Sequence, residues 1–351
     1  MADVVFVLDG TGEHHLFLMK FLNDNLGKDQ CQYLFCGVSC NRDKIVDDSN
    51  AEVISSFLNP SKEVNHLLET CRRIVVVGLF DPGLVVYLNT HRALLKKTAV
   101  VFHGGEFYSM RGNAAWKMRV FHLARRMVVA KMKACYTFTP DDYFFAQDFF
   151  TLPEQHGYVE LPWHFDVGPD RAKLEKPQSP HIIMVGHNAH PEGHHQEILE
   201  SLSRYSDENI RIVSPLSYGP KENRDKIIAC GKRLFGEKFD PLLTWIEPVE
   251  YQKLLQSVSV FAMGIDRQAG TFNMNLMLRL GCKVYAKTDT SLWSYFTEYC
   301  GCSLFDIDSI GRSSFEELIS FTQEERYANS RNMSQRLTPD SCLRSWKAVI
   351  S

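Results

Sequence analysis

The sequence predicts an α/β fold built from two Rossmann-like domains, and three observations support this class. Short apolar runs alternate with amphipathic stretches of helical period, a proline-rich charged segment interrupts the alternation near mid-chain, and the same alternation then restarts. Alternating strands and helices form parallel sheets that helices cover on both faces. The 351 residues are enough for two hydrophobic cores of ordinary domain size.

The first half of the chain opens with a strand. Residues 4–8 (VVFVL) are apolar without interruption, which is typical of a strand buried on both faces. A glycine turn follows at 9–13, and residues 14–26 have the period of an amphipathic helix. The same patterns predict strands at 32–35, 74–77 and 99–102 and helices at 61–70 and 84–96.

The character of the chain changes between residues 162 and 180. This segment has four prolines, several charges and no apolar period, a composition typical of a linker. We therefore expect an N-terminal domain over 1–165, a linker over 166–180 and a C-terminal domain over 181–335. Residues 336–351 are expected to form a C-terminal helix that can pack back on the N-terminal domain.

The second half repeats the strand, turn and helix pattern. Residues 181–185 (HIIMV) form its first expected strand, and a helix is expected over 192–205. Further strands are expected at 210–213, 243–245, 258–263 and 283–285, and a helix at 272–280. Two Rossmann-like halves joined by a linker predict a GT-B fold, in which the halves face each other across a cleft that holds a nucleotide-diphosphate sugar.

Composition excludes several classes of protein. The net charge of −3 argues against a globally basic binder of nucleic acid. No apolar run reaches the roughly 18 to 20 residues of a membrane span, although the protein can rest on a membrane surface. The chain opens directly on a strand and its ten cysteines are scattered, so we expect a cytoplasmic protein with free thiols, no cofactor and no metal site.

The loop at 266–271 (DRQAGT) lies between an expected strand and an expected helix. Arg267 can pair with a phosphate in bidentate fashion, and the helix start provides N–H groups for an anion. An N-capping turn with a surface arginine is the alternative. The residues assigned to the sugar donor here are Arg267, Gln268, Gly270, Thr271 and Asn273.

Two more loops of the second half are expected to contact the sugar donor. Gly186, His187 and Asn188 follow its first strand, and ligands of open α/β sheets bind beyond the carboxyl ends of strands. The histidines in 187–195 have no firm ligand spacing, so we interpret them as hydrogen-bonding or exposed groups and not as zinc ligands. The next strand end adds Ser214, Leu216 and Tyr218, where the tyrosine can stack on a base or the loop can be a structural turn.

In the first half, the turn 10–12 (GTG) can bring backbone N–H groups to an anion at a helix start, and Gly12 is assigned to the sugar donor. His15 stands where a nicotinamide-binding fingerprint needs its third glycine, so that fingerprint is absent. A tight turn without a ligand is the alternative.

A general base for the acceptor hydroxyl is expected in the same half. Glu106, in the HGGEFY loop after the strand 99–102, and His14, at the start of the first helix, are the two candidates. A helix-capping role for Glu106 is the alternative to catalysis. The residues alone do not rank the two candidates.

Residues 116–133 (WKMRVFHLARRMVVAKMK) have six cations, no acidic residue and interleaved large apolar side chains. Such a cationic amphipathic helix can lie on anionic lipid. The alternative is a core-packing helix with a solvated basic face. The residues expected to contact the membrane are Trp116, Lys117, Arg125 and Arg126.

These motifs together carry a family resemblance over most of the chain. They are 7–8 with 14–15, 21–24, 78–82, 105–108, 125–126, 144–146, 185–188, 215–220 and 267–271. In this order they resemble glycosyltransferase family 56, the TDP-N-acetylfucosamine:lipid II N-acetylfucosaminyltransferases of enterobacterial common antigen assembly. The chain departs from the family pattern at Glu106, where the family has aspartate, and at His187, which separates a glycine and an asparagine.

The resemblance implies a metal-independent enzyme at the cytoplasmic face of the membrane. It predicts transfer of a hexose or deoxy-amino-hexose from a TDP- or UDP-sugar to a hydroxyl of a lipid-linked or other glycan acceptor, in cell-surface polysaccharide assembly. Two alternatives remain open: a non-catalytic sensor of nucleotide sugars or glycans with a GT-B shell, and a nucleotide-sugar epimerase.

Overall fold

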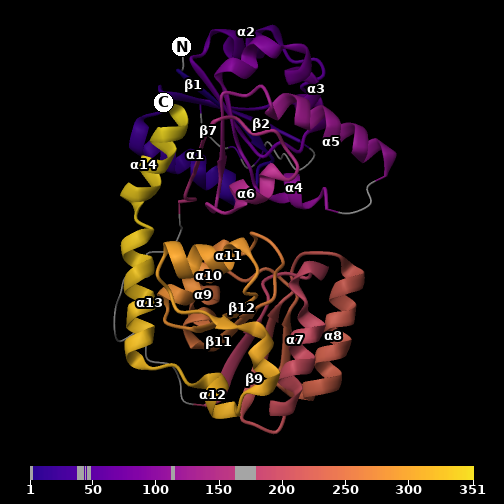
Figure 1. The fold of residues 1–351 in the computed structure, drawn as a ribbon, viewed down its shortest axis with the longest axis vertical. Helices are drawn as coiled ribbons and strands as arrows, with labels where there is room; N and C mark the ends of the chain where they lie inside the picture. The colour runs from indigo at the N-terminus through magenta and orange to yellow at the C-terminus, as the bar shows by residue number, and fades with distance from the viewer. Residues whose placement is uncertain (1–2, 38–42, 44, 46–48, 112–114, 163–178) are drawn as a thin grey trace. The chain divides into compact units, whose positions relative to one another are not determined.

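The computed structural model describes residues 3–37, 43, 45, 49–111, 115–162 and 179–351. The chain divides into two compact units (Figure 1). Unit 1 comprises Met1–His164 together with Thr338–Ser351, and unit 2 comprises Phe165–Leu337. Most of the predicted linker, residues 166–178, lies outside the described residues.

Unit 1 is built on a seven-stranded parallel sheet of order β3-β2-β1-β4-β5-β6-β7. The strands are β1 Val4–Asp9, β2 Cys31–Cys36, β3 Ala51–Val53, β4 Arg73–Val77, β5 Thr98–Val101, β6 Ala134–Thr137 and β7 Gln155–Tyr158. This is the doubly wound order, in which the connections reverse direction between β1 and β4. Ligands bind such sheets at that reversal, beyond the carboxyl ends of the two strands.

Side chains of β1 alternate between two hydrophobic cores, one on each face of the sheet. Val5 and Val7 pack in the core on one face, and Phe6 and Leu8 pack in the core on the opposite face. Burial on both faces explains why residues 4–8 of the strand are all apolar. The helices of the first face are α2 Lys62–Thr70, α3 Pro82–Thr90 and α5 Trp116–Val129; those of the second are α1 Glu13–Leu26 and α14 Pro339–Ile350.

The C-terminal helix α14 belongs to unit 1. Trp346 is fully buried, contacts the ring of Phe6 at a centroid distance of 6.1 Å, and donates its indole N–H to the carbonyl oxygen of Glu160 over 2.8 Å. Arg73 donates from Nε to the carbonyl oxygen of Val349 over 3.0 Å. The end of the chain therefore completes the hydrophobic core that its beginning starts.

Unit 2 repeats this plan with a six-stranded parallel sheet of order β10-β9-β8-β11-β12-β13. Its strands are β8 His181–Val185, β9 Ile210–Pro215, β10 Phe239–Leu242, β11 Val258–Met263, β12 Lys283–Ala286 and β13 Phe305–Asp306. The connections reverse between β8 and β11. Two doubly wound parallel sheets confirm the predicted fold class, although the strand predicted at 243–245 lies at Phe239–Leu242.

The helices of unit 2 lie between its parallel strands, except for the last two, which follow β13. They are α7 His195–Leu202, α8 Lys221–Phe235, α9 Pro248–Ser257, α10 Thr271–Arg279, α11 Ser291–Ser294, α12 Phe315–Ile319 and α13 Gln323–Arg336. Unit 1 also has the short helices α4 Gly105–Tyr108 and α6 Asp142–Gln147. Among the described residues, none of these helices is both long and apolar enough to cross a bilayer.

Candidate active site

In unit 2, two loops predicted to hold the sugar donor flank the reversal of the sheet. Gly186 follows β8 directly, and residues 264–270 connect β11 to α10. The strands β8 and β11 are neighbours in the sheet, so these loops leave it side by side. The fold therefore brings together two sequence motifs that are far apart in the chain.

Gly270 lies close to His187 of the other loop. It has a φ of +69°, a left-handed conformation that favours glycine, and it is the N-cap residue of α10. A Cβ atom here would lie 3.0 Å from the imidazole of His187 and 2.2 Å from Cε of Met263. Only glycine lets the start of α10 approach His187 so closely.

His187 and Asn188 are buried beside this helix start. Nδ2 of Asn188 and Nε2 of His187 lie 2.7 Å apart, and Oδ1 of Asn188 accepts a hydrogen bond from the backbone N–H of His190. Burial lowers the pKa of His187 to about 3, and nearby Arg267 acts in the same direction. A neutral, pre-oriented imidazole therefore lies at the end of β8.

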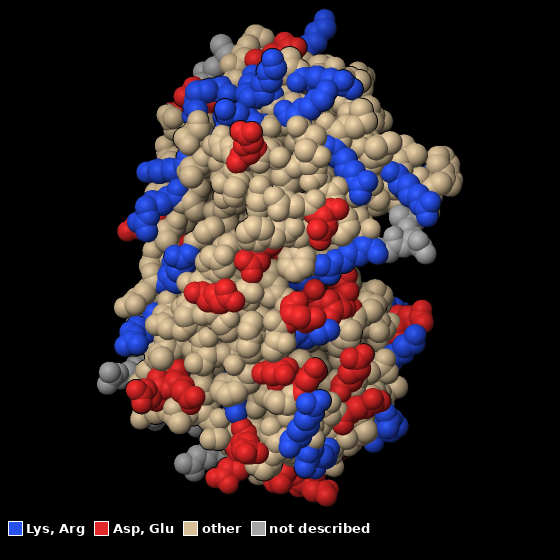
Figure 2. Space-filling model, viewed as in Figure 1, with Lys and Arg blue, Asp and Glu red and all other residues tan. Residues whose placement is uncertain are grey.

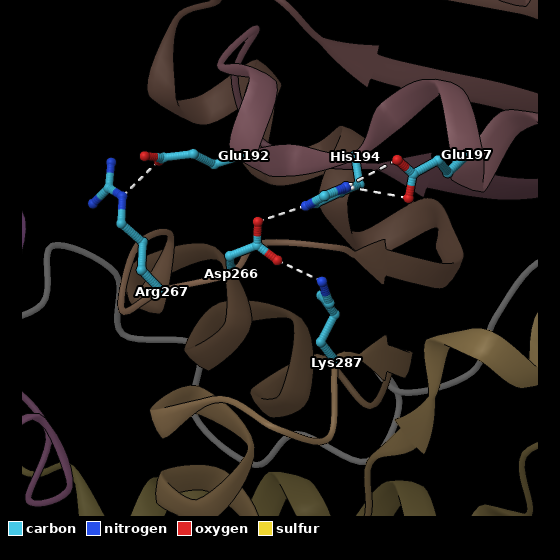
Figure 3. Close-up of polar contacts among 6 residues, drawn as sticks. All are labelled: Glu192, His194, Glu197, Asp266, Arg267 and Lys287. Carbon is cyan, nitrogen blue, oxygen red and sulfur yellow. Dashed lines mark hydrogen bonds and ion pairs between the residues drawn. The ribbon is translucent and has the colours of Figure 1, made fainter. Parts of the chain in front are cut away.

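The loop between β11 and α10 has two charged residues, Asp266 and Arg267, which contact residues outside the loop (Figure 3). Arg267 donates from Nε to Oε2 of Glu192 over 2.6 Å, and its side chain is 24% exposed. Asp266 accepts from Lys287 and forms a 2.6 Å contact with Nε2 of His194. Burial tends to raise the pKa of Asp266, but the hydrogen bonds from Lys287 and His194 outweigh it and the pKa is lowered. Asp266 is therefore held as a carboxylate that positions two cationic groups.

The other residues predicted to contact the sugar donor lie in this loop, on α10 and after β9. Gln268 donates from Nε2 to the hydroxyl oxygen of Thr271 over 3.2 Å. Asn273 accepts from the hydroxyl group of Tyr251 over 3.3 Å. The ring of Tyr218 is 54% exposed, and its centroid lies 6.5 Å from that of His187.

Two predicted residues at the end of β9 and just after it, Ser214 and Leu216, lie deeper than expected. Leu216 is fully buried in the hydrophobic core, and its N–H donates to the carbonyl oxygen of Leu242, so we correct its assignment to the ligand site. Ser214 is also buried, and its hydroxyl group has no partner among the described residues. The loop therefore offers Tyr218 to a ligand more readily than the two residues before it.

In unit 1, the two candidate bases differ sharply in environment. Glu106 is fully buried, and its carboxylate accepts hydrogen bonds from the backbone N–H groups of Leu79 and His103. Burial raises the pKa of Glu106, although these hydrogen bonds and the charge of Arg125 oppose the shift. This carboxylate holds two loops together and has no exposed surface. His14, by contrast, is exposed.

His14 is one of three imidazoles at the carboxyl edge of the unit 1 sheet. His15 lies next to it in the first turn of α1, and His103 follows β5. Burial lowers the pKa of His15 and that of His103, the latter to about 3. Gly12, at the N-cap of α1, leaves room for His14, since a Cβ atom there would lie 2.8 Å from the ring.

Asp9 ends β1 at the reversal of the unit 1 sheet. Its carboxylate accepts a hydrogen bond of 3.0 Å from the backbone N–H of Phe80, in the loop after β4. Burial raises the pKa of Asp9 to about 6, against this hydrogen bond. The sequence analysis did not single out Asp9, His15 or His103 as site residues; the position of Asp9 at the end of the first strand was the available signal.

Helix α5 is amphipathic in an unexpected sense. We correct the assignment of Arg125 to a membrane surface, because it is 1% exposed and donates to the carbonyl oxygens of Leu79 and Glu106. Lys117 and Arg126 are exposed, and Trp116 is 71% exposed. In Figure 2, the end of α5 that projects at the right of the view in Figure 1 shows uncharged atoms with basic side chains beside them.

Known structures share this fold over nearly the whole chain. A glycosyltransferase from Rickettsia africae has a TM-score of 0.72 at 13% identity, with 99% of this chain and 98% of that chain covered. The Anabaena protein HepE, solved with UDP and glucose, has a TM-score of 0.69 at 9% identity, with 98% of each chain covered. Trehalose 6-phosphate synthase from Burkholderia multivorans has a TM-score of 0.68 at 10% identity, with 100% and 98% covered. These likenesses establish the GT-B fold.

The sequence also matches a family over most of its length. Residues 1–325 match the family described as 4-alpha-L-fucosyltransferase glycosyl transferase group 56. The match confirms the resemblance that the motifs predicted. The chain belongs to glycosyltransferase group 56.

Proposed function

We propose that this protein transfers a hexose or deoxy-amino-hexose from a TDP- or UDP-sugar to a hydroxyl of a lipid-linked or other glycan acceptor, in cell-surface polysaccharide assembly. The observation that carries the proposal is the loop before α10, where Arg267, Gly270 and a helix start meet His187 at the reversal of the sheet. Membership of group 56 supports sugar transfer, and the UDP complex of HepE supports a nucleotide ligand for this fold.

The loop before α10 suits a diphosphate. The first N–H groups of a helix have no partner within it, and the helix dipole makes that end positive. Arg267 uses Nε for Glu192, and its two terminal nitrogens have no partner among the described residues. These groups would neutralise the charge that grows on the leaving nucleoside diphosphate, so we propose that this step needs no metal ion.

For the base we propose His14. Transfer requires a group that removes the proton of the acceptor hydroxyl as its oxygen attacks the anomeric carbon and the nucleoside diphosphate leaves. His14 is exposed and forms no hydrogen bond to the described residues, whereas both oxygens of Glu106 accept backbone N–H groups in the interior. We therefore assign Glu106 to the positioning of the loops after β4 and β5.

Helix α5 supplies a surface for a lipid-linked acceptor. Four exposed apolar residues recur at intervals of three and four, which places them on one stripe of the helix. They are Trp116, Val120, Leu123 and Met127. At about 100° per residue, Lys117 lies on one side of this stripe and Arg126 on the other, and both are exposed. We propose that the stripe enters the interface of an anionic membrane while the two cations contact headgroups.

The experiment that tests this function is a transfer assay with purified protein. TDP- and UDP-hexoses and deoxy-amino-hexoses are incubated with a polyprenyl-diphosphate-linked saccharide, and mass spectrometry follows both nucleotide release and the mass of the acceptor. We expect acceptor-dependent release with one added sugar. Binding without release would indicate a sensor, and conversion of the free nucleotide sugar without acceptor would indicate an epimerase.

A variant tests the base within the same assay. His14→Gln should lower kcat by about 10²- to 10⁴-fold, the usual contribution of a general base, while nucleotide affinity stays unchanged. His66→Gln is the matched control, because His66 is an exposed histidine on α2 of the same unit. Undiminished turnover of His14→Gln would remove His14 from the mechanism.

A further inference from the structure

Three histidines in unit 1 form a cluster, and the proposed transfer uses only one of them, His14. His14 and His15 come from the first turn of α1, and His103 follows β5. One ring nitrogen from each can be chosen so that the three atoms all lie within 4.8 Å of one another. The cluster combines one exposed imidazole with two deeper ones.

The pair His15 and His103 is close to the geometry of a metal site. Their Nε2 atoms lie 3.0 Å apart. A tetrahedral zinc ion holds nitrogen ligands at about 2.05 Å, which puts two such nitrogens about 3.3 Å from each other. A shift of a few tenths of an ångström would therefore admit an ion between them.

The backbone orients His15 as it does in metal sites. Nδ1 of His15 donates to the carbonyl oxygen of Gly10 over 2.9 Å, so Nε2 carries the lone pair and is directed at His103. A ligating histidine almost always donates its other ring N–H to a carbonyl or carboxylate group in this way. The carbonyl oxygen of Gly10 would be the outer partner of the site.

His14 provides the third nitrogen and the open side. Its ring centroid lies 4.1 Å from that of His15 and 5.4 Å from that of His103. No hydrogen bond to the described residues holds this ring, so it can turn to bring its nitrogen closer. Because His14 is exposed, a fourth coordination position would face solvent.

We infer that His14, His15 and His103 form a binding site for one divalent transition metal ion that prefers imidazole ligands, such as Zn²⁺. Imidazole suits zinc, cobalt, nickel and copper ions, whereas Mg²⁺ and Ca²⁺ require oxygen ligands. Among the histidines, only those in 187–195 were weighed as zinc ligands from the sequence alone. The site inferred here lies in the other unit, and its members meet only through the order of the strands.

A binding experiment on the full chain tests the site without any enzyme assay. Protein stripped with a chelator is titrated with Co²⁺, whose visible absorption reports coordination by nitrogen, and the bound Co²⁺ is then displaced with Zn²⁺ while calorimetry measures stoichiometry. We expect one ion per chain. His14→Ala and His103→Gln should each weaken binding at least tenfold, and His66→Ala, an exposed histidine of the same unit, should not change it.

Two results of these titrations would overturn the metal site. Absence of a Co²⁺ spectrum, or the same affinity in wild type and His14→Ala, would overturn the site. If His103→Gln fails to fold, the exposed His14→Ala decides alone, with circular dichroism as the check on its fold. Zn²⁺ should also raise the Tm of wild type and leave that of His14→Ala unchanged.

One consequence rests on the proposed function. A ligated His14 has no lone pair for a proton, so bound Zn²⁺ should inhibit transfer, and a chelator should restore it. The two proposals can fail separately, because metal titration decides the site and the transfer assay without zinc decides the function.

Discussion

Gly270 and His187 come from different loops of unit 2, and a Cβ atom at position 270 would lie 3.0 Å from the imidazole of His187 and 2.2 Å from Cε of Met263. The φ of +69° at Gly270 also favours glycine, since other residues adopt this left-handed conformation only with strain. This contact joins the two sequence motifs that the proposal assigns to the sugar donor. The start of α10 and the imidazole of His187 are thereby fixed relative to each other.

The first prediction concerns this contact. Gly270→Ala should weaken binding of a nucleoside diphosphate at least tenfold and destabilise the fold by about 1–3 kcal/mol, through left-handed strain, overlap with Met263 and a tight contact with His187. Gly236→Ala is the control: its φ is +54°, but no atom lies within 4 Å of the added Cβ, so only the strain applies. Calorimetric titration and denaturant unfolding measure the two effects. Equal nucleotide affinity in both variants would refute the contact's role.

The second prediction concerns neighbouring arginines on α5. Arg125→Ala should cost about 3 kcal/mol or more, because it leaves the buried carboxylate of Glu106 without a compensating charge and two carbonyl oxygens without a donor. Arg126→Ala, at an exposed position, should stay within about 0.5 kcal/mol of wild type. Urea unfolding measures both. Similar values for the two variants would show that Arg125 does not support the interior.

The third prediction tests the membrane surface of α5. The protein should co-sediment with vesicles rich in anionic lipid at low salt, and salt should release it. Trp116→Ser with Leu123→Ser should reduce binding through lost apolar contact, and Lys117→Gln should reduce it about fivefold, equivalent to about 1 kcal/mol. Val249→Ser removes an exposed apolar residue of unit 2 and serves as the control. Unaltered sedimentation of the α5 variants would exclude this surface.

The fourth prediction uses the adjacent histidines His194 and His195. Burial lowers the pKa of His195 to about 4, so its contribution to stability is complete above pH 6.5 and is lost as the pH falls toward 4, by up to about 2 kcal/mol at pH 5. Burial tends to lower the pKa of His194 as well, but its hydrogen bonds to Asp266 and Glu197 outweigh burial and raise it. That contribution is present below pH 6.5 and is lost as the pH rises through the raised pKa.

Unfolding free energies measured from pH 4.5 to 8 check the two signs. His195→Asn should flatten the increase of stability with pH, and His194→Gln should make the increase steeper. If neither variant changes the dependence of the unfolding free energy on pH, both pKa shifts are contradicted.

Much of the fold was predictable because buried parallel strands are apolar at nearly every position. The strands that begin at Val4, His181 and Val258 were predicted within one residue of their ends for this reason. The edge strands β3 (AEV) and β7 (QHGY) were missed, since short edge strands carry little apolar signal. The loops after β8 and β11 were predictable as loops at strand ends, and their assignment to the sugar donor stays a prediction.

The interior positions of charged residues were not predictable from pattern alone. On α5 the regular apolar stripe that includes Trp116 and Leu123 is exposed, and the buried face carries His122 and Arg125. A helical wheel places Arg125 opposite the stripe but does not say which side faces the core. The meeting of His15 with His103 likewise depends on strand order, which local sequence does not contain.

We propose above that unit 2 binds a nucleoside diphosphate through Arg267 and the start of α10. Calorimetric titration of TDP and UDP into chelator-treated protein tests it directly, with Arg267→Ala compared with Arg233→Ala, whose side chain is 63% exposed on α8. We expect the nucleotide to bind without metal, with an affinity at least tenfold lower in Arg267→Ala and unchanged in Arg233→Ala. Equal affinity in wild type and Arg267→Ala, or no binding of either nucleotide, would contradict it.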